Sequence, residues 1–143
     1  MMSGIRSRHT KPERIIRSGL HRLGFRFSLH STKLRGTPDL VLPKYRALIF
    51  VNGCFWHGHS CKLFKLPGTR TQFWRAKITR NQQNDTTARS ELLRDGWRVL
   101  TVWECALRGR KDQQIAALLA RITKWLKSSR RSLELRAPQS EGA

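Results

Sequence analysis

The sequence predicts an α/β fold in which a mixed sheet is flanked by helices. Helix and strand patterns follow one another in the order helix, three strands, helix, strand, helix, and this order is typical of a sheet covered by helices. The segments 47–51 and 97–103 are rich in large apolar residues, as are strands with both faces buried. The longer helical segments carry their apolar residues on one side. We therefore expect one sheet with helices packed against it.

A first helix is predicted to begin after Thr10. The segment from Thr10 to Glu13 fits a capping box, in which the Thr hydroxyl caps the helix and the Glu side chain reaches back. The apolar residues that follow at helical spacing are Ile16, Leu20 and Leu23. Gly24 then provides a helix stop.

Three short strands are predicted next. Residues 25–29 alternate between apolar and polar, as in a strand with one buried face. After a polar stretch over 30–38, a second strand is expected over 39–42 and a third over 47–51. Residues 52–67 are too dense in Cys, His, Gly and aromatic residues for regular structure.

A long helix is predicted from about Thr71 to Gly96. Its apolar stripe consists of Trp74, Ile78, Ala88 and Leu92. Asn81 and Asp85 fill the gap in that stripe, and polar side chains on an inward helix face are costly unless they are paired. The inward position of these two polar residues therefore needs an explanation other than core packing.

A strand over 97–103 and a final amphipathic helix complete the predicted core. The apolar positions of that helix are Ile115, Leu118, Leu119, Ile122, Trp125 and Leu126. The chain shows no internal repeat and no domain linker. We expect a flexible basic arm over 1–9, a single folded domain over 10–127, and a polar, frayed tail over 128–143.

The charge of the chain indicates a nucleic-acid partner. Lys and Arg number 29 against nine Asp and Glu, which gives a formal net charge of +20 along the 143 residues. Such a chain is expected to bind a polyanion, and its helices lack the pattern of helices that lie on membranes. No apolar run approaches the roughly 18 residues of a membrane span, and no secretory signal is expected. The alternative is a basic domain that its charge keeps soluble.

Four potential metal ligands lie close together in the sequence. They are Cys54, His57, His59 and Cys61, and Cys105 follows 44 positions after Cys61. A structural zinc site takes four Cys or His ligands in a closed tetrahedron, and an odd number of cysteines favours metal ligands or free thiols over disulfides. Three cysteines and one histidine would suffice, but spacing does not decide between the two histidines. The alternative is a set of unrelated core thiols and loop histidines.

Three acids are candidates for chemistry in a chain that has few. Asp39, at the start of a strand, could hold Mg²⁺ against a phosphate. Asp85 could orient a catalytic histidine, and Glu13 could reach a water beside the metal. The structural alternatives are a turn for Asp39, a salt bridge for Asp85 and helix capping alone for Glu13.

Aromatic and basic residues gather around the Cys/His segment. Phe55 and Trp56 lie inside it, and Trp74 lies at the start of the long helix. The nearby basic residues are Lys62, Lys65, Arg70 and Arg75. Rings beside basic side chains could stack on nucleic-acid bases or wedge between them, although Trp74 could equally be a core residue.

Five segments taken together resemble the very short patch repair (Vsr-type) DNA mismatch endonucleases. They are 10–13 (TKPE), 36–39 (GTPD), 52–61 (NGCFWHGHSC), 69–74 (TRTQFW) and 97–107 (WRVLTVWECAL). The resemblance extends over roughly residues 2–110 and rests on the combination of these motifs. It implies a restriction-endonuclease-like core with a structural Zn²⁺. It also implies a Mg²⁺-dependent nick on the 5′ side of the thymine in a T:G mismatch. Such mismatches arise when 5-methylcytosine deaminates, and the nick initiates very short patch repair.

The resemblance also implies roles for particular residues. Asp39 matches the residue that binds Mg²⁺, helped by a backbone carbonyl near Val51. His57 matches the catalytic histidine, and Asp85 and Glu13 match supporting acids. The implied zinc ligands are Cys54, His59, Cys61 and Cys105. The residues implied to contact DNA are Phe55, Trp56 and Trp74, as intercalating rings, and Met2 and Ile5, in an arm that enters the minor groove.

The chain also departs from related patterns. Restriction-type cores usually add an acid-x-Lys motif about ten residues after the aspartate, but segment 48–52 contains neither an acid nor a Lys. Asp39 is therefore expected to be the only strand carboxylate on the metal. Asn52 stands where some members have His, and the arm before Thr10 is short.

These observations give a set of expected partners. We expect a monomer that acts on double-stranded DNA with a T:G mismatch, in a bacterial cytoplasm at the nucleoid, and on no membrane. A cytosine methyltransferase and mismatch-repair proteins are the expected functional partners. The alternatives are a non-catalytic, zinc-stabilised nucleic-acid-binding protein and a related nuclease with a different DNA substrate.

Overall fold

The computed structural model describes residues 10–55, 57–59 and 65–137. Five strands form one sheet in the order β1-β2-β3-β4-β5. They are β1 (Ser28–Leu29), β2 (Leu40–Leu42), β3 (Ala47–Asn52), β4 (Arg98–Trp103) and β5 (Ser132–Leu135). Strands β1, β2 and β3 pair antiparallel, whereas β3, β4 and β5 pair parallel. The predicted mixed sheet is confirmed.

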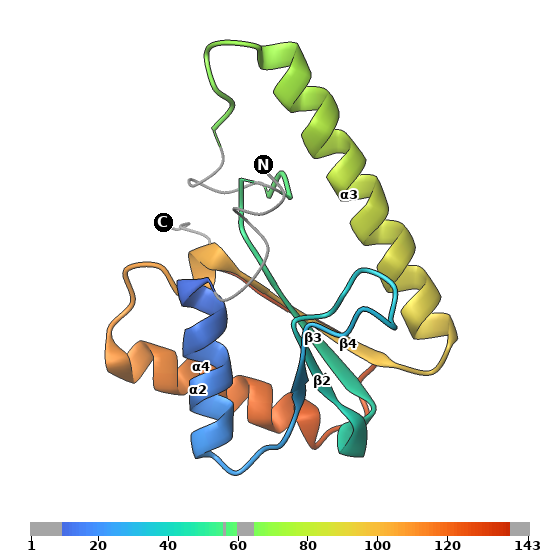
Figure 1. Ribbon diagram of the computed structural model, residues 1–143. Coiled ribbons are helices and arrows are strands. Elements are labelled where there is room, and N and C mark those ends of the chain that lie inside the picture. The colour runs from blue at the N-terminus through green and yellow to red at the C-terminus, as the bar shows by residue number, and fades with distance from the viewer. Residues whose placement is uncertain (1–9, 56, 60–64, 138–143) are drawn as a thin grey trace.

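Three helices cover the two faces of this sheet (Figure 1). They are α2 (Lys11–Arg22), α3 (Thr71–Arg94) and α4 (Asp112–Leu126). Ile16 of α2 and Ile122 of α4 share one buried cluster with Leu100 of the sheet, while Leu92 of α3 packs with Leu48 and Val99. Helices α2 and α4 therefore cover one face, and the end of α3 covers the other.

Alternation along the strands explains this division. Leu48 lies opposite Val99 and Ile49 lies opposite Leu100 in the parallel pair of β3 and β4. Successive side chains of a strand point to opposite faces, so Ile49 and Leu100 enter the cluster under α2 and α4, whereas Leu48 and Val99 enter the cluster under α3. The sheet is thus buried on both faces, as the apolar runs predict.

The start of α2 shows the first half of the predicted capping box, the Thr10 cap, whereas the Glu13 carboxylate contacts residues outside the first turn. The Thr10 hydroxyl accepts a hydrogen bond from the Glu13 N–H at 3.4 Å, and Gly24, with φ of +97°, follows the end of the helix. The carboxylate of Glu13 is almost fully buried and contacts Arg17 and His30. Helix α2 therefore carries an acid into the interior.

Two elements differ from the sequence prediction. The strand expected over 25–29 is limited to Ser28–Leu29. We expected a frayed polar tail after residue 127, but Ser132–Leu135 forms β5 along the free edge of β4. Leu135 is 1% exposed within the main core, so burial of this side chain and the ladder with β4 order the segment.

The long helix α3 begins away from the sheet and ends on it (Figure 1). Its buried residues are Ile78, Ala88 and Leu92. Its first turns extend past the end of the sheet (Figure 1). None of the described helices is both long and apolar enough to cross a membrane.

Candidate active site and metal centre

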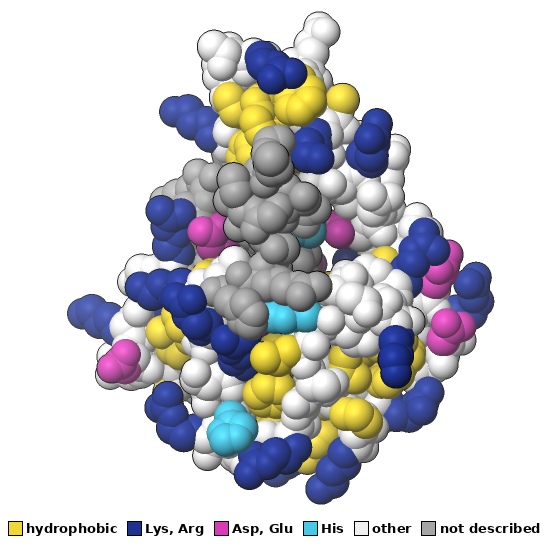
Figure 2. All heavy atoms as spheres, in the orientation of Figure 1, with side chains coloured by type: hydrophobic (Ala, Val, Ile, Leu, Met, Phe, Trp, Pro, Cys, Tyr) yellow, Lys and Arg dark blue, Asp and Glu magenta, His cyan; other side chains and the backbone are white. Residues whose placement is uncertain are grey.

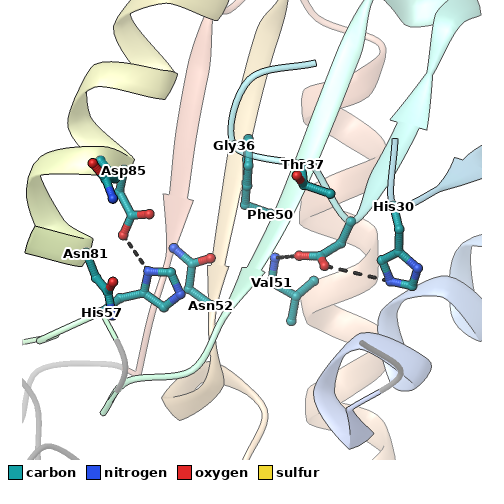
Figure 3. A pocket seen from close by; sticks show the side chains of 11 residues that line it. His30, Gly36, Thr37, Phe50, Val51, Asn52, His57, Asn81 and Asp85 are labelled. Carbon is teal, nitrogen blue, oxygen red and sulfur yellow. Dashed lines mark hydrogen bonds and ion pairs between the residues drawn. The ribbon is translucent and has the colours of Figure 1, made fainter. Parts of the chain in front are cut away.

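A cleft of about 400 Å³ opens where β3 ends and β2 begins. Polar side chains that are distant in the sequence line it. They are His30, Thr37, Asp39, Asn52, His57, Asn81, Asn84 and Asp85. Figure 3 shows His57 and Asp85 on one side of this cleft and His30 and Val51 on the other. The cleft therefore brings together three of the acids and histidines that the sequence singled out.

Asp39 is fixed by the backbone around it. Its N–H donates to the Ile49 carbonyl at 3.0 Å, and its carboxylate oxygen Oδ2 accepts from the Val51 N–H at 2.7 Å. Burial raises the pKa of Asp39 to about 6, the Val51 hydrogen bond opposes that rise, and the charge of Glu13 adds to it. Burial therefore disfavours the charge of this carboxylate, and a cation bound beside it would favour that charge.

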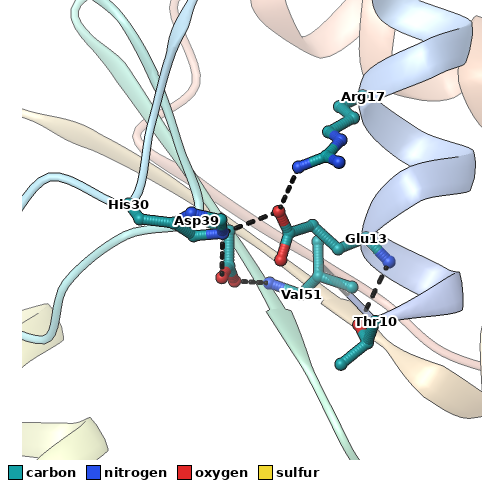
Figure 4. A network of polar contacts seen from close by, with 6 residues as sticks. All are labelled: Thr10, Glu13, Arg17, His30, Asp39 and Val51. Carbon is teal, nitrogen blue, oxygen red and sulfur yellow. Dashed lines mark hydrogen bonds and ion pairs between the residues drawn. The ribbon is translucent and has the colours of Figure 1, made fainter. Parts of the chain in front are cut away.

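Glu13 and Asp39 are neighbours in space through His30 (Figure 4). His30 Nε2 lies 2.7 Å from Glu13 Oε2 and 3.9 Å from Asp39 Oδ1. Arg17 Nη1 lies 3.0 Å from the same oxygen of Glu13. Sequence reasoning identified the two acids but missed His30, because a single histidine in a polar stretch carries no signal of its own.

His57 and Asp85 form an ion pair on the opposite side of the cleft. The Nδ1 atom of His57 contacts Asp85 Oδ2, and Asp85 lies on the face of α3 that turns toward the sheet. Gly58 makes this approach possible, because a Cβ there would lie 2.6 Å from Ile78 Cγ2 and the backbone has φ of +61°. Gln82 donates to the Gly58 carbonyl at 3.0 Å, so α3 holds the loop that carries His57.

A second histidine of the same loop lies in a separate cluster. The ligand atoms of Cys54, His59 and Cys105 all lie within 4.8 Å of one another and are buried. His59 Nδ1 is 3.5 Å from Cys54 Sγ and 3.6 Å from Cys105 Sγ. This cluster could hold a metal ion, and it includes His59 whereas His57 pairs with Asp85. Cys61 lies outside the described residues.

The sheet supports this metal cluster. The ring of Trp103 stacks on His59 with 4.0 Å between centroids and 6° between planes, and its Nε1 donates to Glu134 of β5. The Ala137 N–H donates to Cys105 Sγ at 3.3 Å. Burial lowers the pKa of His59, and the charge of Arg136 adds to this effect. The neutral imidazole that a metal ion requires is therefore favoured.

Aromatic and basic side chains meet at the start of α3. Phe55 contacts Trp74 edge-on at 5.6 Å, Phe73 is 41% exposed, and the Arg70 guanidinium lies 4.3 Å from the Phe73 ring centroid. Figure 2 shows hydrophobic side chains beside Lys and Arg side chains in this part of the surface. The structure therefore joins two of the predicted intercalating rings.

The remaining predicted DNA contacts divide into two groups. Lys65, Arg70 and Arg75 are exposed. Met2, Ile5, Trp56 and Lys62 lie outside the described residues.

Comparison with known proteins gives one consistent family. The family model described as DNA mismatch endonuclease Vsr matches residues 1–63. The DNA mismatch endonuclease Vsr of Escherichia coli is 46% identical over 125 residues, which cover 87% of this chain and 80% of the relative. The type II nicking enzyme V.XorIIP of Xanthomonas oryzae is 44% identical over 122 residues, covering 85% and 86% of the two chains. The type II nicking enzyme V.NmeAIP of Neisseria meningitidis is 42% identical over 110 residues, covering 77% and 79%.

Proposed function

This chain belongs to the Vsr family of DNA mismatch endonucleases, and we propose that it nicks one strand of duplex DNA on the 5′ side of the thymine in a T:G mismatch. The nick would be a Mg²⁺-dependent hydrolysis of one phosphodiester bond, and it would initiate very short patch repair. The observation that carries this proposal is one cleft with a partly buried carboxylate, Asp39, on one side and the His57–Asp85 pair on the other.

The donor set around Asp39 fits a magnesium ion. Glu13 and Asp39 supply carboxylate oxygens, and the Val51 carbonyl points to the same edge of β3 as the Val51 N–H, since a strand residue presents both groups to one neighbour. Oxygen ligands, some of them water and phosphate, are what Mg²⁺ takes in such enzymes. A Mg²⁺ ion bound there would neutralise the charge that develops on the scissile phosphate.

His57 is the proposed general base. The contact between its Nδ1 and Asp85 fixes the ring and leaves Nε2 as the nitrogen that takes the proton of the attacking water. Asp85 stabilises the imidazolium that results, and it does so without giving up its own charge. Asn52 also lines the cleft, and its amide cannot act as a base.

The metal cluster and the aromatic rings serve recognition in this proposal. Zn²⁺ bound by Cys54, His59, Cys61 and Cys105 would close a tetrahedral site and hold the loop that carries Phe55 and His57. The rings of Phe55, Trp56 and Trp74 would intercalate beside the mismatch, as apolar wedges do in kinked DNA. Met2 and Ile5 would enter the minor groove, and the neighbouring Lys62, Lys65, Arg70 and Arg75 would contact phosphates.

The proposal includes a cellular setting. The enzyme would act as a monomer in the bacterial cytoplasm at the nucleoid, on sites where a cytosine methyltransferase has placed 5-methylcytosine. Mismatch-repair proteins would be its functional partners.

A nicking assay tests the proposed function. Zinc-loaded protein and Mg²⁺ are incubated with two labelled duplexes that differ only in T:G or C:G at one position. We expect one nick beside the T of the first duplex and none in the second. Equal cleavage of both would leave a nuclease without this repair role. No cleavage of either, with salt-dependent binding retained, would identify a non-catalytic DNA-binding protein.

Two histidine variants complete this assay. His57→Gln should slow nicking by about 10²–10⁴-fold, which is the usual contribution of a general base, with DNA binding retained. His21→Gln is the matched control, because His21 is exposed on α2 and does not line the cleft. Equal effects of the two substitutions would remove His57 from the reaction.

A further inference from the structure

One side of the cleft holds a mixed nitrogen and oxygen cluster. Glu13 comes from α2, His30 from the segment after β1, and Asp39 from the residue before β2. One ligand atom from each of the three lies within 4.8 Å of the other two. Figure 4 shows the three side chains pointing toward one another. Three separate elements therefore converge on a space of the size that a single metal ion occupies.

The three side chains are held in place by the surrounding structure. The His30 side chain is 8% exposed and that of Glu13 is 2% exposed. The backbone N–H of His30 donates to the Asp39 carbonyl at 3.0 Å, which ties the two residues together. Because Asp39 Oδ2 accepts from the Val51 N–H, Oδ1 is the oxygen that faces His30. Ligands positioned before the ion arrives lose little conformational freedom when it binds.

The charges in this cluster favour a cation. Two carboxylates are brought together, and one guanidinium, that of Arg17, contacts Glu13 at 3.0 Å. The two carboxylates therefore bring like charges close together, which a cation between them would relieve. A divalent ion would offset these charges, and His30 Nε2, 2.7 Å from Glu13 Oε2, lies close enough to bind the same ion.

The chemical types of these ligands indicate which kind of metal ion the cluster would bind. Carboxylate oxygens suit Mg²⁺ and Mn²⁺ alike, whereas an imidazole nitrogen favours first-row transition metals over Mg²⁺. We propose that Glu13, His30 and Asp39 form a binding site for one first-row transition-metal ion of the Mn²⁺ type, with His30 as a direct ligand. This inference deepens the proposed function, in which Asp39 holds the Mg²⁺ ion, and it predicts that the cleft binds Mn²⁺ more tightly than Mg²⁺.

Electron paramagnetic resonance with Mn²⁺ tests this site directly. Protein whose Cys/His centre is loaded with zinc is titrated with Mn²⁺ in the absence of DNA, and electron spin echo modulation detects ¹⁴N bound to the ion. We expect one bound Mn²⁺ with a directly coordinated nitrogen. His30→Gln should remove the nitrogen signal and weaken Mn²⁺ binding by about tenfold or more, since even the loss of an outer partner of a metal ligand costs about 10- to 100-fold.

Two further variants keep the result interpretable. His57→Gln removes an imidazole from the opposite side of the same cleft, so the nitrogen signal and the Mn²⁺ affinity should stay as in the wild type. His30→Asp replaces the nitrogen ligand by an oxygen, so it should retain an ion, lose the nitrogen signal and reduce the preference for Mn²⁺ over Mg²⁺. Thermal unfolding of each variant identifies any that fails to fold.

Three results would overturn the site. They are the absence of bound Mn²⁺ at millimolar ion, the absence of a nitrogen signal in the wild type, and a signal and affinity that His30→Gln leaves unchanged. Because no DNA is used, this outcome is separate from the nicking assay. A nitrogen-coordinated Mn²⁺ in a protein that nicks no T:G duplex would leave the metal site standing and remove the proposed function.

Discussion

Asp39→Asn should abolish nicking and, in the protein without Mg²⁺, make the fold more stable above pH 6. Asp39 is the proposed ligand of the catalytic ion, and the loss of such a ligand should remove several kcal/mol of transition-state stabilisation, which corresponds to about 10³-fold or more in rate. The gain in stability has a separate cause. Above pH 6 the partly buried carboxylate is charged without an ion to pair with, and the isosteric amide avoids that cost.

The sign of this effect follows from the pKa. Burial raises the pKa of Asp39 from 3.8 to about 6, so between these two values the folded protein binds more protons at this position than the unfolded chain does. Stability therefore decreases as the pH rises from about 4 to about 6. The difference amounts to at most about 3 kcal/mol above pH 6, and it disappears below pH 4.

Denaturant unfolding at two pH values measures this effect. We expect zinc-loaded Asp39→Asn to be more stable than the wild type at pH 8, and the two to be nearly equal at pH 4. Asp95→Asn is the control, because Asp95 is an exposed acid at the end of α3 and should give no pH-dependent difference. A variant that is less stable than the wild type at pH 8 would show that the charge of Asp39 is compensated within the fold.

Cys105→Ala should remove the bound metal and destabilise the whole domain. Cys105 is buried against Cys54 and His59, and apparent binding free energies of structural zinc sites are about 10–16 kcal/mol. The loss of one ligand should therefore cost several kcal/mol of folding free energy. It should also reduce nicking, because the loop that carries His57 begins at this centre.

Elemental analysis and thermal unfolding together test the metal centre. The wild type should contain one zinc ion for each chain, and Cys105→Ala should contain much less and melt at a lower temperature. A chelator should lower the melting temperature of the wild type, and added Zn²⁺ should restore it. A variant that keeps a full complement of zinc and its melting temperature would show that Cys105 is only a core thiol.

The helices and strands whose apolar residues follow a regular pattern over several turns or positions could be predicted from the sequence. The stripe that ends at Leu126 identifies α4, and the apolar runs identify β3 and β4. Strand β5 was not predicted from the sequence because its only large apolar residues are Leu133 and Leu135, which alternate with charged residues. Their strand conformation depends on the edge of β4, which no local pattern shows.

The composition of the site was predictable in part. Chemistry and family resemblance identified Asp39 and His57, but the contact of Glu13 with Asp39 passes through His30, which no spacing predicts. Spacing likewise allowed either histidine of the loop to bind metal. The choice depends on how the loop packs against α3 at Gly58, and this is a property of tertiary structure.

Whether a cation held by Asp39 acts on the phosphate beside the mismatched thymine is tested most directly with sulfur-substituted DNA. One non-bridging oxygen of the phosphate 5′ to the T in a T:G duplex is replaced by sulfur, which Mg²⁺ binds poorly and softer metal ions accept more readily. In single-turnover assays we predict that one diastereomer is nicked slowly with Mg²⁺ and that Mn²⁺ restores the rate. Equal rates for both diastereomers with Mg²⁺, and no gain with Mn²⁺, would contradict a metal ion at the scissile phosphate.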